Sequence, residues 1–257
     1  KNMIKFSKFI WIYFFLSALV LVPGTYSLIR WGLRPSIDFT GGTLIEVQKD
    51  NKSEILRFKS DEKVASVTGT IVRSETVGPV LGKELLEKAT AASIVAIIAI
   101  LGYVAYAFKN IRFGVSAVIA LVHDLLVVLG IFSLLGHYKG VEVDTLFVTA
   151  FLTTMSFSVH DTIVVFDRIR EYRKKDTKTT FVDTCDRALT ETMGRSLTNS
   201  FTIVFMLLAL VLMGGETVRW FVVALLVGTI SGTYSSPFVA TPILILWDKW
   251  ERRASRS

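Results

Sequence analysis

The chain has 257 residues, of which 51% are hydrophobic and 20% are charged, and its mean hydropathy is +0.52. Ordinary water-soluble domains are less apolar than this, so the composition excludes most soluble enzymes. The net charge of +7 would suggest a nucleic-acid partner in a soluble protein. In a membrane protein, the positive residues must first be assigned to one side of the membrane or the other. The single cysteine, Cys185, excludes an internal disulfide and a cysteine metal site.

Uncharged stretches of about twenty residues predict membrane-spanning helices, because a helix crosses ~30 Å of hydrocarbon at ~1.5 Å per residue. Four stretches contain no Asp, Glu, Lys or Arg: 9–29, 89–108, 197–215 and 220–247. Two more, 113–136 and 145–166, are interrupted only by the pairs His123-Asp124 and His160-Asp161. The sequence therefore predicts six spans. The first is interpreted as a retained span, because its apolar run is too long for a signal peptide.

Lys and Arg are distributed unevenly between the two sides of these spans. Seventeen of the 29 lie at the chain ends or in the loops after spans two and four, whereas the loops 137–144 and 216–219 contain one each. This asymmetry predicts that both termini are cytoplasmic. The excess positive charge then sets the topology or contacts anionic lipid headgroups, so a nucleic-acid role loses its support.

The segment 31–88 between spans one and two predicts a small external α+β domain. Residues 43–47 and 66–72 alternate as strands do, and 82–88 predicts a short helix that leads into span two. Gly41 and Gly42 precede the first strand, where glycine permits a positive φ or the close approach of another backbone. Two strands are little for an independent core, so we expect the domain to lean on the membrane surface or on a partner.

The loop after span four begins with a charged continuation of that span. Thr180 and Asp183 then resemble a capping box, and apolar residues at helical spacing, Cys185 among them, predict a short amphipathic helix on the cytoplasmic face. The predicted organisation is a cytoplasmic N-terminus with span one (1–30), the external domain (31–88), spans two to four (89–166), this cytoplasmic loop (167–196), and spans five and six with the cytoplasmic C-terminus (197–257).

Asp161 is the strongest candidate for a functional residue, because an ionisable side chain inside a span costs ~3 kcal/mol or more and normally faces the bundle interior. It lies on the cytoplasmic side of the midplane of span four, and Arg195 begins span five on that same side. The two are therefore expected at similar depth, close enough to pair. A neighbouring Arg favours the carboxylate, and its departure favours protonation, which is the chemistry of a proton relay.

Further polar side chains follow spans four and five at helical spacing: Thr149, Thr153, Ser156 and His160, then Arg195, Asn199 and Thr202. Such a stripe can line a file of water. The alternative is that the hydroxyls bond the i−4 carbonyls or join helices. Asp124, near the midplane of span three, either extends the proton path or hydrogen-bonds a neighbour.

The two His-Asp pairs admit another interpretation, as metal ligands or as the aspartates of an intramembrane protease. Adjacent helical residues point about 100° apart, so His and Asp at i and i+1 do not readily chelate one metal. The sequence contains no Walker motif, nucleotide-binding glycine fingerprint or Ser-His-Asp spacing, so no cofactor is expected. Any work would draw on an ion gradient or on a partner's ATP.

Span six contains Gly228 and Gly232, a small-residue face that predicts tight helix packing. The residues that follow, Ser235, Ser236, Pro237 and Pro242, predict kinks.

Five segments together resemble the SecF family, the smaller of the two paired subunits of the SecDF protein-translocation accessory complex, in the resistance-nodulation-division (RND) superfamily. They are SIDFTGGTLIEV (36–47), VGPVLGKEL (77–85), IALVHDLLVVLG (119–130), VHDTIVVFDRIREYRK (159–174) and DRALTETMGRSLTNSFT (186–202). The resemblance implies a six-span half-bundle that joins a six-span SecD, with the external domain where polypeptide leaves the SecYEG channel. It also implies that proton flow moves the external domains and helps draw a translocating chain outward.

The resemblance assigns roles to single positions. The membrane aspartate of the family falls on Asp161 and its arginine on Arg195. The structural motif of the external domain falls on Asp38, Phe39, Gly41 and Gly42. Position 160 is usually Asn in the family and is His here, which adds a group that titrates near neutral pH. The external domain is shorter than the two-layer module expected.

The expected function is therefore that of a non-enzymatic subunit of the cell membrane that uses the proton gradient to assist protein export. One alternative is an RND-type exporter of lipids or hydrophobic small molecules, which would share the bundle and the relay but carry a larger external domain. Another is an assembly subunit that only stabilises the channel. Coupling to protons rather than to sodium is itself only implied by the resemblance.

Overall fold

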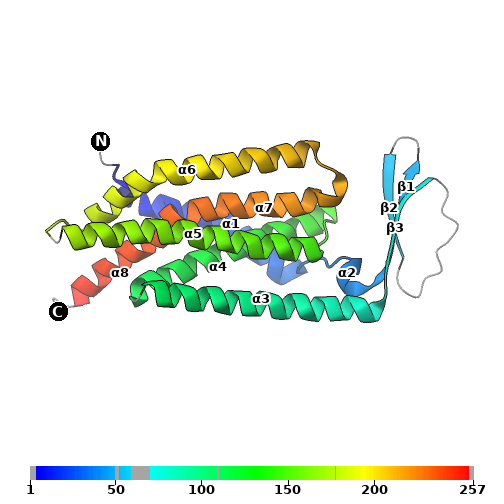
Figure 1. Ribbon diagram of the computed structural model, residues 1–257, viewed down its shortest axis with the longest axis horizontal. Helices are drawn as coiled ribbons and strands as arrows, with labels where there is room; N and C mark the ends of the chain where they lie inside the picture. Colours follow the sequence, from blue (N-terminus) through cyan, green and yellow to red (C-terminus); the bar gives the residue numbers. More distant parts are fainter. Residues whose placement is uncertain (1–3, 50–51, 59–69, 109, 177, 255–257) are drawn as a thin grey trace.

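The computed structural model describes residues 4–49, 52–58, 70–108, 110–176 and 178–254. Its long helices lie side by side in one bundle, and a small sheet stands beyond one end of that bundle (Figure 1). Both chain ends lie at the opposite end, as Figure 1 also shows. The two chain ends lie at the same end of the bundle because the chain runs along the bundle an even number of times.

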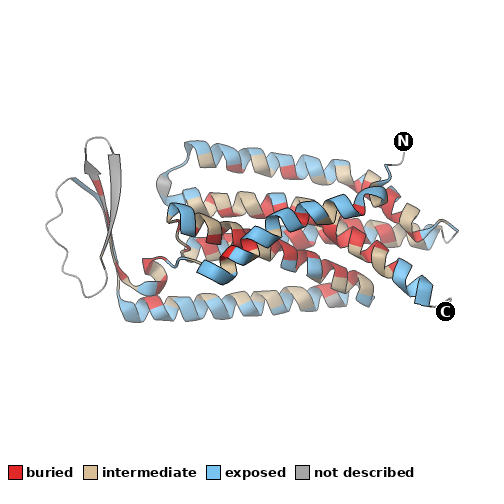
Figure 2. Cartoon of the chain, turned by 180° about the vertical axis from the view of Figure 1, so that it is seen from behind, coloured by how far each residue is buried: buried red, intermediate tan, exposed pale blue. Residues whose placement is uncertain are grey.

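Over the described residues, six helical segments are long and apolar enough to cross a membrane, which confirms the six predicted spans. They are α1 (Ile10–Trp31, after the 3₁₀ turn η1, Phe6–Phe9), α3 (Pro79–Phe108), α4 (Ile111–Lys139), α5 (Thr145–Lys175), α6 (Phe181–Met213), and a sixth made of α7 (Glu216–Ser235), the π turn η2 (Ser236–Ala240) and α8 (Thr241–Ala254). Buried residues concentrate on α4, α5 and the sixth span, whereas α3 and α6 are mostly exposed (Figure 2).

Glycines bring α5 and α7 into close contact, as the small-residue face of span six predicts. A Cβ added to Gly228 would lie 2.3 Å from Cγ2 of Thr154, and one added to Gly232 would lie 3.1 Å from Cα of Ser158. Helices α1 and α4 also cross at a glycine pair, and nearby the Ser27 and Ser133 hydroxyls are hydrogen-bonded at 2.8 Å. Helix association in a membrane depends on such close packing and on interhelical hydrogen bonds.

The sixth span is broken at the π turn η2, which contains Pro237. Proline has no backbone N–H and its ring displaces the preceding turn, so the hydrogen-bonding pattern widens there. The Thr241 hydroxyl donates to the Ser236 carbonyl at 3.1 Å across this turn. The regular α-helical hydrogen bonding is therefore interrupted at Ser236–Ala240, which contains the predicted kink site Pro237.

The segment after α5 differs from the prediction. The expected short amphipathic helix is not separate, because α6 runs without interruption from Phe181 through Gly194 to Met213. Its predicted N-cap, Thr180, accepts a hydrogen bond from the Asp183 N–H. One face of this first part is buried, including Cys185 and Leu189. That burial, together with the tolerance of helices for a single glycine, accounts for the continuity.

The sheet has three antiparallel strands in the order β2-β1-β3: β1 (Gly42–Lys49), β2 (Lys52–Phe58) and β3 (Thr70–Val77). The predicted strand 43–47 lies within β1. Of the predicted strand 66–72, positions 66–69 lie outside the described residues and 70–72 belong to β3. The predicted helix 82–88 is the first part of α3, and a further short helix, α2 (Ile37–Thr40), precedes β1.

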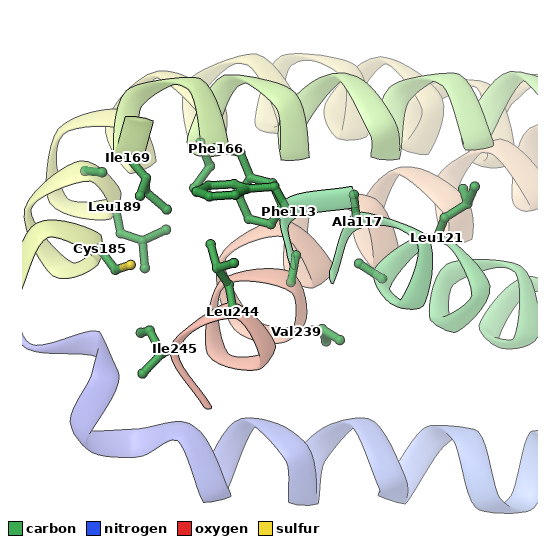
Figure 3. Packing of buried hydrophobic residues seen from close by; sticks show 14 of the residues in the cluster. Phe113, Ala117, Leu121, Phe166, Ile169, Cys185, Leu189, Val239, Leu244 and Ile245 are labelled. Atoms are coloured by element: carbon green, nitrogen blue, oxygen red, sulfur yellow. The ribbon is translucent and has the colours of Figure 1, made fainter. Parts of the chain in front are cut away.

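The largest apolar cluster lies toward the end of the bundle that carries the termini. Side chains of α4, α5, α6 and α8 meet there, among them Phe113, Phe166, Leu189 and Leu244 (Figure 3). The rings of Phe113 and Phe166 are arranged edge to face with centroids 5.2 Å apart. Cys185 is fully buried in this cluster, as its assignment to an apolar position predicts.

Candidate functional site

Asp124 on α4 is the centre of a buried polar network inside the bundle. Its two carboxylate oxygens accept hydrogen bonds from three serine hydroxyls, those of Ser158 on α5 at 2.5 Å and of Ser231 and Ser235 on α7 at 2.6 Å each. The side chain is 5% exposed. The cost of a buried carboxyl group is offset only when such donors surround it. Asp124 thereby ties three helices together.

His123 extends the network toward α1. Its Nδ1 lies 3.0 Å from Oδ1 of Asp124, and its ring stacks on Tyr234, with centroids 6.2 Å apart. The Tyr234 hydroxyl donates to the backbone carbonyl of Tyr13 at 2.7 Å. Nε2 of His123 is buried and has no hydrogen-bond partner among the described residues.

Ser158 also leads from Asp124 toward Asp161. The Thr162 hydroxyl lies 3.1 Å from the Ser158 carbonyl and 2.8 Å from the Ser236 hydroxyl on the sixth span. Thr162 follows Asp161 directly in α5. The network at Asp124 and the neighbourhood of Asp161 are therefore joined through one helix turn.

Asp161 is half-buried where α5 faces α6 and the sixth span. It borders two small cavities, one of ≈ 20 Å³ on the side of Asn199 and Thr233 and one of ≈ 10 Å³ on the side of Ser196 and Ser236. A cavity of at least 10–15 Å³ with polar walls has room for about one water molecule. Asp161 thus lies beside the polar side chains of α6 that spacing predicted, here Asn199.

Arg195 lies at the same depth as Asp161 but does not pair with it. Asp161 precedes the last residue of α5 by fourteen positions, and Arg195 follows the first residue of α6 by fourteen, so both lie ~21 Å from the turn that joins these helices. Arg195 is exposed, whereas Ser196 and Asn199 line the cavities beside Asp161. Over the described residues, no ion pair joins Arg195 to Asp161.

The exposed hydroxyls of the predicted stripe bond their own helices. Thr149 donates to the Thr145 carbonyl at 3.1 Å, Thr153 to that of Thr149 at 2.7 Å, and Thr202 to that of Thr198 at 2.9 Å. These are the i−4 bonds of the structural alternative. Thr149, Thr153, Ser156 and His160 are nevertheless exposed along α5.

Residues 38–42, at the junction of α2 and β1, connect the sheet to the helix bundle. Asp38 accepts hydrogen bonds from the N–H and the hydroxyl of Thr145 at 3.1 and 3.0 Å, and Asp144 accepts from the Phe147 N–H at 2.6 Å. Two carboxylates thus cap the N-terminus of α5. Burial raises the pKa of Asp144, while the Phe147 N–H acts to lower it and the charge of Asp38 to raise it. Phe39, which follows Asp38 in α2, is buried, with 7% of its surface exposed.

Both glycines of the motif are required by close contacts. Gly41 has φ +71° and Gly42 has φ +132°, values that favour glycine. A Cβ on Gly41 would lie 2.8 Å from Cα of Pro79, and one on Gly42 would lie 2.6 Å from the Phe58 carbonyl oxygen. Positive φ and close backbone approach, the two predicted reasons for these glycines, are both present.

The sequence pointed to Asp124 as a group that could hydrogen-bond a neighbour, but it did not identify Ser231 as a partner of that residue. The available signal was the spacing of Ser231 and Ser235, which places two hydroxyls on one face of span six. No group of three or more His, Cys, Asp or Glu side chains among the described residues is arranged to hold a metal ion.

Two descriptions of protein families match this chain, and together they cover most of residues 27–250. Residues 59–250 match the family described as "Protein export membrane protein SecD/SecF, C-terminal", and residues 27–50 match the "SecD/SecF GG Motif". The second match contains the Gly41-Gly42 pair that contacts Pro79.

Individual relatives and solved structures show the same similarity. The protein translocase subunit SecF of Thermobaculum terrenum is 38% identical over 96% of this chain and 94% of its own length, and that of Anaerolinea thermophila is 36% identical over 95% and 94%. The crystal structure of SecDF from Thermus thermophilus, a translocon-associated membrane protein, superimposes with a TM-score of 0.86 at 29% identity. That match covers 97% of this chain and 39% of the longer SecDF chain. SecDF in its super-membrane-facing form gives a TM-score of 0.78.

Proposed function

Because this chain belongs to the SecF family of protein translocase subunits, we propose that it couples the transmembrane proton gradient to protein export and that Asp161 carries the proton. SecF is a subunit of the SecDF complex, which assists protein export, so a SecD partner accompanies this multi-pass membrane protein. The SecYEG channel and a translocating polypeptide are the further partners in this proposal. The relatives that match almost full length are protein translocase subunits, which favours export of protein over export of lipids or small molecules.

The position of Asp161 is the observation that carries the proposal. Its carboxyl group borders two cavities of the size of single water molecules and has no ion-pair partner among the described residues. A proton carrier needs both properties, because a group locked in a permanent ion pair does not exchange its proton readily. Asp124 differs, because three serine hydroxyls donate to it and the His123 ring lies against it, and we assign it to holding helices together at the centre of the network.

Arg195 and His160 complete the proposed relay. Arg195 shares the depth of Asp161, so a rotation of α6 would bring the guanidinium toward the carboxylate and favour its ionised form. His160 borders the same cavity as Asp161, so its imidazole ring lies beside the proposed carrier. Both termini face the cytoplasm in this proposal, on the strength of the uneven distribution of Lys and Arg.

The decisive experiment compares Asp161→Asn with the unchanged chain in membrane vesicles that contain SecD and SecYEG. Asparagine keeps the shape and polarity of the side chain but cannot release a proton, so we expect the gradient-stimulated part of export to be lost while SecD still co-purifies. The matched control is Asp176→Asn, which removes a carboxylate from the loop between α5 and α6 and should leave export unchanged.

Three results would revise the proposal, the first two from this experiment and the third from a variant of Arg195. Full activity of Asp161→Asn would exclude the aspartate as carrier and leave the assembly role. Stimulation by a sodium gradient alone would replace the proton as coupling ion. Arg195→Met should shift the pH dependence of the infrared carboxyl band of Asp161, and an unchanged band would remove Arg195 from the relay.

A further inference from the structure

A basic cavity opens at the end of the bundle that carries both termini, far from Asp161. Its volume is ≈ 480 Å³, within the range of small-molecule sites. Four cations line it, Arg112 on α4 and Arg170, Arg173 and Lys174 in the last turns of α5, together with the single carboxylate Asp248 on α8. Residues from three helices thus bring a surplus of positive charge to one cavity.

Two of the four cations, Arg173 and Lys174, form no ion pair with any described residue. Asp248 is already engaged by Arg252 at 2.7 Å and by Arg112 at 3.7 Å, and Arg112 also contacts Glu251 at 2.7 Å. Arg173 uses one of its five N–H donors, on the Thr179 carbonyl at 3.1 Å. Lys174 is exposed.

The C-terminus of α5 attracts cations, but it does not account for all of them. A helix end carries the equivalent of about half an elementary charge, whereas three cations gather on the last turns of this helix. The N-termini of α4 and α6 border the same cavity at Asn110 and Phe181 and add positive potential. An anion with several acceptor oxygens fits this field, and phosphate is the group that Arg and Lys bind in this way.

Apart from Asn110, the remaining lining residues are apolar. They are Phe113, Phe181 and Leu244, and Figure 3 shows Phe113 and Leu244 in the apolar cluster. Two tryptophans follow on α8, and Trp250 is 69% exposed, as is typical of side chains at a membrane interface. A free phosphate ion has no apolar group to bury against these side chains, whereas the glycerol and upper acyl carbons of a lipid can pack against them.

We propose that this cavity binds the phosphate headgroup of an anionic phospholipid from the leaflet on the side of the termini. Arg173 and Lys174 contact the phosphate, and Phe113 and Leu244 contact the apolar part below it. The site is separate from the proton relay, so its test does not depend on the coupling mechanism.

The test measures lipid binding to the delipidated complex of this chain with SecD in detergent, by native mass spectrometry. The probes are phosphatidylglycerol, phosphatidylcholine and inorganic phosphate. One variant, Arg173→Gln with Lys174→Gln, removes two cations of the cavity. The matched control, Lys178→Gln with Lys249→Gln, removes two cations at the same end of the bundle that do not line it. Lys174→Gln alone is the milder variant, because that side chain has no ion pair to lose.

Each cation near a lipid phosphate contributes about fivefold in affinity. We therefore expect phosphatidylglycerol to bind in preference to phosphatidylcholine, with a loss of about fivefold in Lys174→Gln and ~30-fold in the double variant, and no loss in the control. Equal losses in both double variants would show general attraction to the surface and overturn the proposal. No preference for phosphatidylglycerol would overturn it too, as would its displacement by inorganic phosphate, which would identify a free anion as the ligand.

Discussion

The side chain of Asp124 shows how the bundle accommodates an acidic group at mid-depth. Three serine hydroxyls from α5 and α7 and the His123 ring of α4 converge on its two oxygens, so the interactions that offset its burial also hold these helices in register. Removing this acceptor leaves the Ser158 and Ser231 hydroxyls without a partner among the described residues, whereas the Ser235 hydroxyl keeps only the Gly232 carbonyl at 3.3 Å.

Replacing Asp124 by alanine is therefore expected to lower the free energy of unfolding by about 3 kcal/mol. Thermal or SDS-induced unfolding in detergent would measure the change. Ser93→Ala is the control, because this hydroxyl bonds only the Ala89 carbonyl of its own helix. An unfolding midpoint for Asp124→Ala as high as that of the control would show that the network contributes nothing to stability.

Asp144 leads to a prediction about pH. Because burial raises its folded-state pKa, the native chain is relatively more stable at low pH and loses that contribution as the pH rises through the folded pKa. Asp144→Asn retains the N-cap oxygen for Phe147 without the charge. Its melting temperature relative to the native chain should therefore increase from about pH 4 to about pH 7.

Asp144→Ala provides the comparison, because it removes the cap itself. It should cost about 1 kcal/mol at neutral pH. A difference between Asp144→Asn and the native chain that stays constant with pH would contradict the assigned shift.

At the scale of the helices, α5 and α7 cross closely because Gly228 on α7 has no side chain. The Cβ of an alanine at Gly228 would overlap Thr154, so the two helices would have to separate. Serine hydroxyls on both crossing helices donate to Asp124 on α4. They are Ser158 on α5, and Ser231 and Ser235 on α7. Separation would thus weaken the polar network as well as the packing.

Gly228→Ala is expected to destabilise the chain by about 1–3 kcal/mol, as overpacking does. Gly102→Ala on α3 is the matched control, because no atom lies within 4 Å of its added Cβ. That control should be neutral or gain up to about 1 kcal/mol from helix propensity. Detergent unfolding of both variants decides the matter, and similar midpoints would show that the crossing can relax.

The elements also show which features the sequence can predict. Span positions follow from hydropathy alone, so all six were predictable, and the cost of a buried charge identified Asp161 and Asp124. The continuity of α6 was not, because it depends on a face buried against other helices. Strand β2 was not predicted, because it is recognised by its pairing with β1, a tertiary contact that the local sequence does not show. The exposure of Arg195 likewise depends on the rotation of α6, which spacing does not fix.

At the scale of the whole molecule, the chain has an exposed face that suits a protein better than lipid. Thr149, Thr153, Ser156 and His160 are exposed on α5 within a span. Polar groups in a span normally face protein or water rather than acyl chains. We therefore expect the SecD partner of the complex to cover this face.

A photoreactive amino acid at Thr153 should therefore form an adduct with SecD in membranes. The control position is Ile98 on α3, which is 63% exposed and apolar. It should react with lipid and give no SecD adduct. Equal yields of SecD adduct at the two positions would exclude the α5 face as the site of contact.

Helix α3 has a mechanical consequence for the whole chain. Its thirty residues extend ~45 Å, no residue of its most apolar stretch is buried, and only Gly78 separates it from β3. The first turn also touches the glycine motif, since a Cβ on Gly82 would lie 2.8 Å from the Gly41 nitrogen. Near its other end, Val104 is 2% exposed and belongs to the apolar cluster, so α3 is held at both ends and exposed between them. A tilt of about 10° at one end carries the attached sheet ~8 Å at the other.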